Sequence, residues 1–162
     1  MAGRREKNAA EPTAYQRALG LLVRREHSRK ELSRKLKAKG VEPDDLDVAL
    51  EKLARQDFQN DERFASALAR TRAASGQGPA RIRSELATHG LPRDTIEAAL
   101  EACERDWTIS ASELVARRYA NKNLSDPAIR RKVVDFLLRR GFEQKSVFAA
   151  VRQSHGGDEA ED

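Results

Sequence analysis

Residues 28–53 read SRKELSRKLKAKGVEPDDLDVALEKL, and the rest of the chain repeats the pattern of this stretch. Its first half is basic, carries Leu32 and Leu36 four residues apart, and ends at Gly40. Its second half is acidic and opens with Pro43. A glycine just after a helix and a proline in the first turn of the next are common boundary signals. The stretch therefore predicts two short amphipathic helices joined by a tight turn.

The same pattern returns twice, as GPARIRSELATHGLPRDTIEAALEAC at residues 78–103 and IRRKVVDFLLRRGFEQKSVFAAVRQS at residues 129–154. Three glycines, Gly40, Gly90 and Gly141, align the copies. Apolar residues then recur eight and four residues before each glycine and one, six and ten residues after it. They are Leu32, Leu36, Val41, Leu46 and Leu50; Ile82, Leu86, Leu91, Ile96 and Leu100; and Val133, Leu137, Phe142, Val147 and Val151. Five matched positions in three copies indicate an internal repeat of about fifty residues.

A further apolar helix precedes each pair and completes a three-helix unit. The fold class predicted is all-α, with three tandem three-helix repeats, about nine helices, forming an elongated, curved solenoid. The boundaries predicted are an N-terminal arm at 1–12, repeats at 13–58, 59–106 and 107–154, and an acidic tail at 155–162. We expect the arm and tail to be disordered, because they have too few apolar residues to offset the entropy of ordering.

Local signals suggest how helices start and how repeats meet. Ser28 with Glu31, and Ser110 with Glu113, have the spacing of capping boxes at helix N-termini. Phe58 and Trp107 fall at the junctions between repeats, where we expect them to pack one repeat on the next rather than to stack on bases. Residues 76–79, GQGP, are interpreted as a linker rather than a phosphate-binding loop.

Composition narrows the class of protein. Of 162 residues, 35% are charged and only 5% are aromatic, which favours helices and small repeated cores over a sheet. No apolar run is long enough to span a membrane, and the first twelve residues lack the apolar core of a secretory signal. The single cysteine, Cys103, cannot form an internal disulfide. We expect a cytoplasmic protein.

Residues suited to catalysis are few. His27, His89 and His155 are far apart and none has the spacing of a metal site. His89 next to Gly90 is better explained as a favourable charge at a helix C-terminus, and Cys103 as a buried apolar side chain. No general base, nucleophile or Gly-rich phosphate loop can be assembled. The sequence predicts a protein that is not an enzyme and needs no cofactor or metal.

Charge is segregated along the chain, whose net charge is +5. Residues 13–40 carry nine basic and two acidic side chains, whereas residues 41–57 carry six acidic and two basic ones. The second repeat has the same division, and residues 114–145 are again strongly basic. If the repeats stack, their basic helices would align and form a continuous basic strip. Such a strip could follow a polyanion or an acidic groove. Ordinary solvated helix faces explain the charge pattern equally well.

Three segments together resemble a known family. Residues 18–40, ALGLLVRREHSRKELSRKLKAKG, are similar to the first repeat of the RecX family, bacterial regulators of the RecA recombinase. Residues 78–91, GPARIRSELATHGL, resemble its second repeat. Residues 130–142, RRKVVDFLLRRGF, with ARRY at 116–119, resemble its third. Each motif alone is a generic basic helix, but the three in this order, covering residues 13–153, are fairly specific.

The resemblance implies a non-enzymatic regulator without cofactor that lies in the groove of the RecA–DNA filament. We expect the chain to be a monomer. It would inhibit the recombinase, ATPase and co-protease activities of RecA and so modulate DNA repair and the SOS response. No catalytic motif is carried over, only a basic surface for the RecA filament or for DNA. That surface comprises Arg24, Arg25, Arg29, Lys30, Arg34, Lys35, Arg81, Arg83, Arg117, Arg118, Arg130, Arg131, Lys132, Arg139 and Arg140.

Two other functions fit the same residues. The chain could be a stand-alone helical-repeat protein that binds single- or double-stranded DNA through its basic strip, or a helical scaffold for another acidic protein. Binding to naked DNA with a steep dependence on salt would favour the DNA-binding function.

Overall fold

The computed structural model describes residues 10–154, so most of the predicted arm and all of the predicted tail lie outside the described residues. The chain divides into two compact units, Met1–Asp61 and Glu62–Asp162, and each is described by itself. Unit 1 corresponds to the first repeat of the sequence pattern. Unit 2 contains the second and third repeats.

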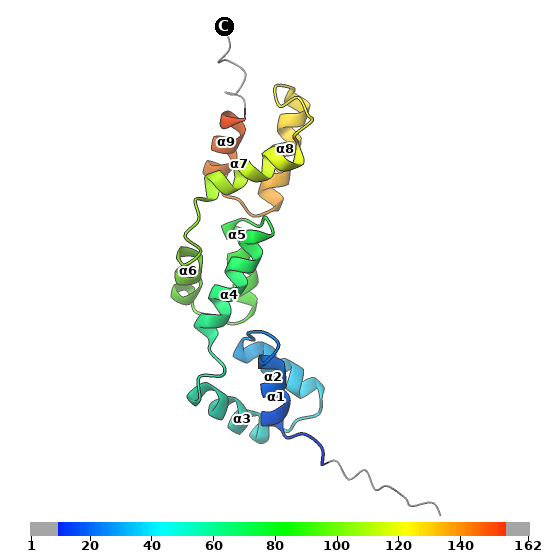
Figure 1. The fold of residues 1–162 in the computed structure, drawn as a ribbon, viewed down its shortest axis with the longest axis vertical. Helices are drawn as coiled ribbons and strands as arrows, with labels where there is room; N and C mark the ends of the chain where they lie inside the picture. The colour runs from blue at the N-terminus through cyan, green and yellow to red at the C-terminus, as the bar shows by residue number, and fades with distance from the viewer. Residues whose placement is uncertain (1–9, 155–162) are drawn as a thin grey trace, which may run out of the picture. The chain divides into compact units, whose positions relative to one another are not determined.

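Within residues 10–154 the structure contains nine α-helices and no strand, which confirms the all-α class and the three-helix repeats (Figure 1). The helices are α1 (Ala14–Leu22), α2 (Arg29–Ala38), α3 (Pro43–Arg55), α4 (Asp61–Ala74), α5 (Pro79–Thr88), α6 (Arg93–Glu101), α7 (Trp107–Arg118), α8 (Pro127–Arg139) and α9 (Gln144–Gln153). No helix of this part of the chain is long and apolar enough to cross a membrane.

Each repeat has its own small core, built from the predicted apolar stripes. All fifteen stripe residues are buried except Val41 and Val151, which are partly buried. The first helix of each repeat adds small residues, such as Ala18, Ala65 and Ala111, which are fully buried and let the helices approach closely. The period of the apolar residues thus places one face of every helix against its own repeat.

The helix caps differ in part from those predicted. Ser28 accepts a hydrogen bond from the backbone N–H of Glu31, but the Glu31 carboxylate contacts other side chains, so only half of that capping box forms. The box predicted at Ser110 and Glu113 is wrong, because α7 already begins at Trp107. Its N-cap is Asp106, which accepts from the N–H groups of Thr108 and Ile109.

The aromatic residues at the junctions behave differently. Trp107 is half-buried and packs against the cores of both the second and the third repeat, as predicted. Phe58 keeps 48% of its surface exposed, which is more than a core position allows. His89 is the C-cap of α5, and its ring lies 4.6 Å from that of Phe64.

The second and third repeats are joined end to end through backbone. The N–H of Gly78 donates to the carbonyl of Arg140 (2.7 Å), and the N–H of Ala80 donates to that of Gly141 (2.9 Å). These are amide groups at the start of α5 and carbonyl groups at the end of α8, which have no partner inside their own helices. A Cβ on Gly78 would lie 2.4 Å from the backbone of Gly141. Residues 76–79 are therefore not only a linker; they form the contact between repeats.

Candidate interaction surface

Glu31 organises the basic residues at the start of α2. Its carboxylate is 9% exposed, accepts two hydrogen bonds from the guanidinium of Arg25, and lies 3.0 Å from Nζ of Lys35. Burial alone would raise the pKa of Glu31, but the hydrogen bonds from Arg25 and Lys35 outweigh it and lower the pKa to about 2. Two predicted site residues, Arg25 and Lys35, are therefore engaged within unit 1.

His27 is buried beside this carboxylate. Its Nδ1 lies 3.0 Å from the carbonyl oxygen of Arg25, and its Nε2 lies 3.2 Å from Nζ of Lys35. Because an ammonium group can only donate, Nε2 accepts and the ring proton sits on Nδ1, where it donates to the carbonyl. Burial lowers the pKa of His27, so the neutral ring belongs to the folded state.

Two more of the predicted basic residues pair with carboxylates. Arg29 of α2 lies 3.2 Å from Glu51 of α3. Arg83 of α5 donates twice to Glu97 of α6, at 2.6 and 3.1 Å, and a further guanidinium nitrogen lies 3.6 Å from Glu143. The hydrogen bonds from Arg83 lower the pKa of Glu97. These pairs leave Arg29 and Arg83 less available to an outside anion.

Three further arginines are oriented by unit 2 without any carboxylate. The guanidinium carbons of Arg118 and Arg140 lie 4.8 and 5.4 Å from the centre of the Phe136 ring, within the range of cation–π contacts. Arg140 also donates to the carbonyl of Ser75 (3.3 Å), and Arg81 donates to that of Arg139 (3.4 Å). Their guanidiniums are therefore held in place without an ion pair to any residue in 10–154.

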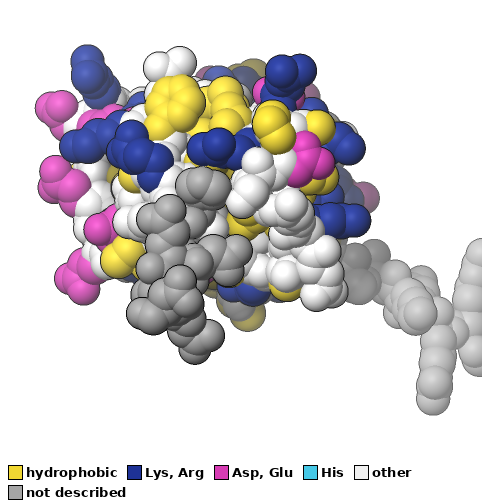
Figure 2. Space-filling view, turned by 90° about the horizontal axis from the view of Figure 1, so that it is seen from above, with side chains coloured by type: hydrophobic (Ala, Val, Ile, Leu, Met, Phe, Trp, Pro, Cys, Tyr) yellow, Lys and Arg dark blue, Asp and Glu magenta, His cyan; other side chains and the backbone are white. Residues whose placement is uncertain are grey.

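The remaining predicted residues have no ion pair with any residue in 10–154. All are exposed except the half-buried Arg130. They are Arg24, Lys30, Arg34, Arg117, Arg130, Arg131, Lys132 and Arg139. Figure 2 looks onto the end of the chain that carries α7–α9 and shows Lys and Arg side chains in dark blue beside exposed apolar side chains in yellow. Each unit thus offers free positive charge, on α2 and on α7–α8.

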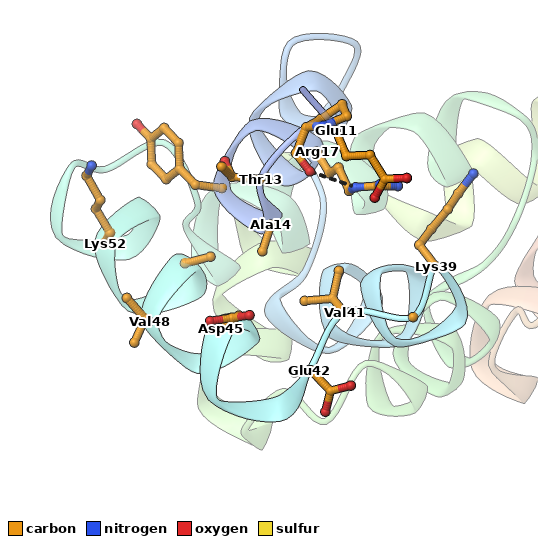
Figure 3. Close-up of a pocket in the computed structure, with 14 residues that line it drawn as sticks. Glu11, Thr13, Ala14, Arg17, Lys39, Val41, Glu42, Asp45, Val48 and Lys52 are labelled. Carbon is orange, nitrogen blue, oxygen red and sulfur yellow. Dashed lines mark hydrogen bonds between the residues drawn. The ribbon is translucent and has the colours of Figure 1, made fainter. Parts of the chain in front are cut away.

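A groove of about 610 Å³ lies in unit 1, between the start of α1 and the α2–α3 turn (Figure 3). Val41 and Val48 face it, and Val48 is 69% exposed. Its charged side chains have both signs: Glu11, Arg17, Lys39, Glu42, Asp45 and Lys52. Nζ of Lys52 lies 4.5 Å from the centre of the Tyr15 ring, so this lysine already has an aromatic partner. The mixture of charges does not define a ligand.

Some side chains that shape the surface were not singled out from the sequence. Glu31 stands at the spacing of a capping box, and Phe136 stands within an apolar run, so neither position suggested a contact with arginine. Gly78 had one signal: it aligns with Ser28 of the first repeat, and a glycine in place of serine allows a closer backbone approach. No group of His, Cys, Asp and Glu among the described residues could hold a metal ion.

The fold and the surface define a tandem three-helix-repeat protein with segregated charge. A comparison with models of known families identifies the family. Residues 14–53, 60–100 and 110–151 match the RecX first, second and third three-helix domains. The chain belongs to the RecX family. The exact boundaries predicted for the repeats remain a prediction.

Curated relatives agree with this assignment. A protein of Xanthomonas axonopodis pv. citri, called regulatory protein RecX, is 53% identical over 93% of both chains. A protein of the same name from Stenotrophomonas maltophilia is 49% identical over 91% of both chains. The crystal structure of RecX from Lactobacillus salivarius shares the fold, with a TM-score of 0.68, 23% identity, and coverage of 86% of this chain and 93% of that one.

Proposed function

We propose that this chain binds the groove of the RecA–DNA filament as a monomer and inhibits the recombinase, ATPase and co-protease activities of RecA, thereby modulating DNA repair and the SOS response. The observation that carries the proposal is the set of exposed basic residues without internal partners on α2, α7 and α8, on a chain of the RecX family. Such residues favour a long acidic partner.

The basic residues differ in what they are expected to contribute. Arg24, Lys30 and Arg34 in unit 1, and Arg131 and Lys132 in unit 2, can turn to an outside partner without leaving an internal carboxylate. Arg25 and Lys35 would leave Glu31 buried without its partners if they turned outward, which is costly. We therefore assign the free residues to the partner and the paired ones to the folded repeat.

Charge reversal at Arg131 and Lys132 tests the proposal. In Arg131→Glu/Lys132→Glu, the concentration needed to half-inhibit RecA's single-stranded-DNA-dependent ATP hydrolysis should rise about tenfold, equivalent to ~1.4 kcal/mol. The matched control, Arg55→Glu/Arg93→Glu, makes the same change in net charge on α3 and α6, whose other charges are mostly acidic, and should inhibit like the parent. Equal inhibition by both folded variants would remove α8 from the contact surface.

The second candidate function is binding to DNA alone, and the guanidiniums of Arg118 and Arg140 above Phe136 favour it. Titrating the parent protein into the same ATPase assay, beside its binding to naked single-stranded DNA, separates the two. Inhibition below one protein per RecA, where the DNA is barely bound, supports the filament regulator. Inhibition that appears only once the DNA is coated supports competition for DNA.

A further inference from the structure

We propose that a groove on unit 2 binds an arginine side chain from a basic segment of a partner protein. The groove has a volume of about 340 Å³. Its walls come from the start of α5, the end of α6, the loop that follows it, and the starts of α7 and α9. They are Pro79, Arg83, Glu97, Leu100, Glu101, Glu104, Arg105, Trp107 and Glu143. None of the free basic residues assigned above to the RecA filament lies in it, and Arg83, which does, is paired with Glu97.

The apolar part of the groove consists of Pro79, Leu100 and Trp107. Pro79 and Leu100 are buried, whereas Trp107 is half-buried and so presents part of its indole to solvent. Indole is the best aromatic surface for a cation, and a planar guanidinium can stack on it. The tryptophan is held in position by packing against the cores of both neighbouring repeats.

The charged part of the groove is acidic. Four glutamates face two arginines, so the lining carries two net negative charges. Arg83 uses the carboxylate of Glu97 and reaches Glu143. Glu101 and Glu104 are exposed and have no ion pair with any residue in 10–154, and Arg105 is the other cation in the lining. A visiting cation would therefore meet two carboxylates that are not already paired.

The groove already contains one guanidinium group, that of Arg83, and one of its carboxylates binds it. The two hydrogen bonds between Arg83 and Glu97, at 2.6 and 3.1 Å, are the paired contacts that a planar guanidinium makes with a carboxylate. An ammonium group makes no such paired contact and does not stack as a plane. A free metal ion is disfavoured, because no group of potential ligands in the described residues is close enough to hold one. Charge and shape together favour arginine.

The partner is a protein segment rather than nucleic acid, since a phosphate backbone would be repelled by the unpaired carboxylates. The groove is open, so an arginine can enter while its own backbone stays outside. This surface is distinct from the basic residues on α2, α7 and α8. The inference therefore does not depend on the proposed function.

The test uses Trp107, which is the single tryptophan of the chain and lies in the groove. An acetylated and amidated pentapeptide, Gly-Arg-Gly-Arg-Gly, is titrated into the full chain without RecA or DNA, and tryptophan emission is recorded. We expect a saturable change in emission. In Glu101→Gln/Glu104→Gln the apparent Kd should rise about tenfold, because the peptide loses its unpaired carboxylates.

The control variant is Glu62→Gln/Glu113→Gln, which removes the same two charges from exposed positions of unit 2 outside the groove. It should bind the peptide with the Kd of the parent. The inference is overturned by an unchanged emission or by equal weakening of binding in both variants. It is also overturned if spermidine, or the same pentapeptide with lysine in place of arginine, binds as tightly as the arginine peptide. The last result would mean that the groove attracts cations in general.

Discussion

Replacing Gly141 with alanine is expected to destabilise unit 2 by about 3–6 kcal/mol, from the strain of a crowded backbone and the loss of contacts between repeats. Gly141 has φ +91, and a Cβ there would lie 2.4 Å from Cβ and 2.5 Å from the backbone nitrogen of Arg81. The neighbouring atoms belong to α5 and include backbone, so a rotamer change cannot relieve the overlap. The overlap is relieved only if the start of α5 and the end of α8 move apart.

Separation exposes the groups that now satisfy each other. The N–H groups of Gly78 and Ala80 lose the carbonyls of Arg140 and Gly141 and bind water instead, and each hydrogen bond lost in this way costs about 0.5–1.5 kcal/mol. A left-handed conformation adds about 1–2 kcal/mol for alanine. Trp107, which packs on both repeats, should also become more exposed.

Gly40→Ala is the matched control. Gly40 ends α2 at the equivalent position of the first repeat and has φ +79, but no atom lies within 4 Å of a Cβ placed there. The Gly40→Ala variant should lower the stability of unit 1 only by the strain of a left-handed alanine, about 1–2 kcal/mol. Hydrogen exchange measured by mass spectrometry gives the loss of protection separately for each unit. Equal losses in the two variants would show that the contact between α5 and α8 contributes little.

The repeat cores could be predicted from the sequence because their signal is local and periodic. Leu32, Ile82 and Val133 occupy equivalent positions eight residues before a glycine, and all three are buried. A helix that buries one stripe repeats its apolar residues every three to four positions, whatever the rest of the fold does. Because the pattern occurs in three copies, its signal in the sequence is stronger than that of a single copy.

The pairing of the surface could not be predicted in the same way. Arg83 and Glu97 are fourteen positions apart, and the sequence shows two charges on separate helices without showing that they meet. Similarly, the spacing of Ser28 and Glu31 favoured a capping box, but the basic neighbours Arg25 and Lys35 compete for the same carboxylate and win. A carboxylate is attracted more strongly by two positively charged side chains than by one neutral backbone N–H. A list of basic residues therefore overestimates how many are free.

Replacing Glu31 with glutamine is expected to lower the free energy of unfolding of unit 1 by about 3 kcal/mol at pH 7. The folded pKa of Glu31 is about 2, against an ordinary value of 4.5. The difference measures how much more favourably the fold holds the charged carboxylate than the protonated one, at about 1.4 kcal/mol per pKa unit. Glutamine keeps the shape of the side chain but not the charge.

The sign of the pH dependence follows from the lowered pKa. The stabilisation by Glu31 is fully present above pH 4.5 and is lost as the pH falls from 4.5 towards 2, because the unfolded chain takes up the proton first. His27 acts in the same direction. Its pKa is also lowered in the fold, so stability begins to decline below its ordinary value of 6.5. Unit 1 of the parent protein should therefore lose stability progressively in acid, whereas unit 1 of Glu31→Gln should retain only the histidine part of that loss.

Glu51→Gln is the control for a surface ion pair. Glu51 also pairs with a basic residue of α2, Arg29, but the side chains are 59% and 43% exposed. Its loss should cost less than about 1 kcal/mol and leave the acid limb of the stability curve unchanged. Urea unfolding of the full chain at pH values from 3 to 7, followed by circular dichroism and by Trp107 emission for unit 2, resolves the two units. An acid limb as steep in Glu31→Gln as in the parent would place the acid-sensitive group elsewhere, because glutamine at this position binds no proton.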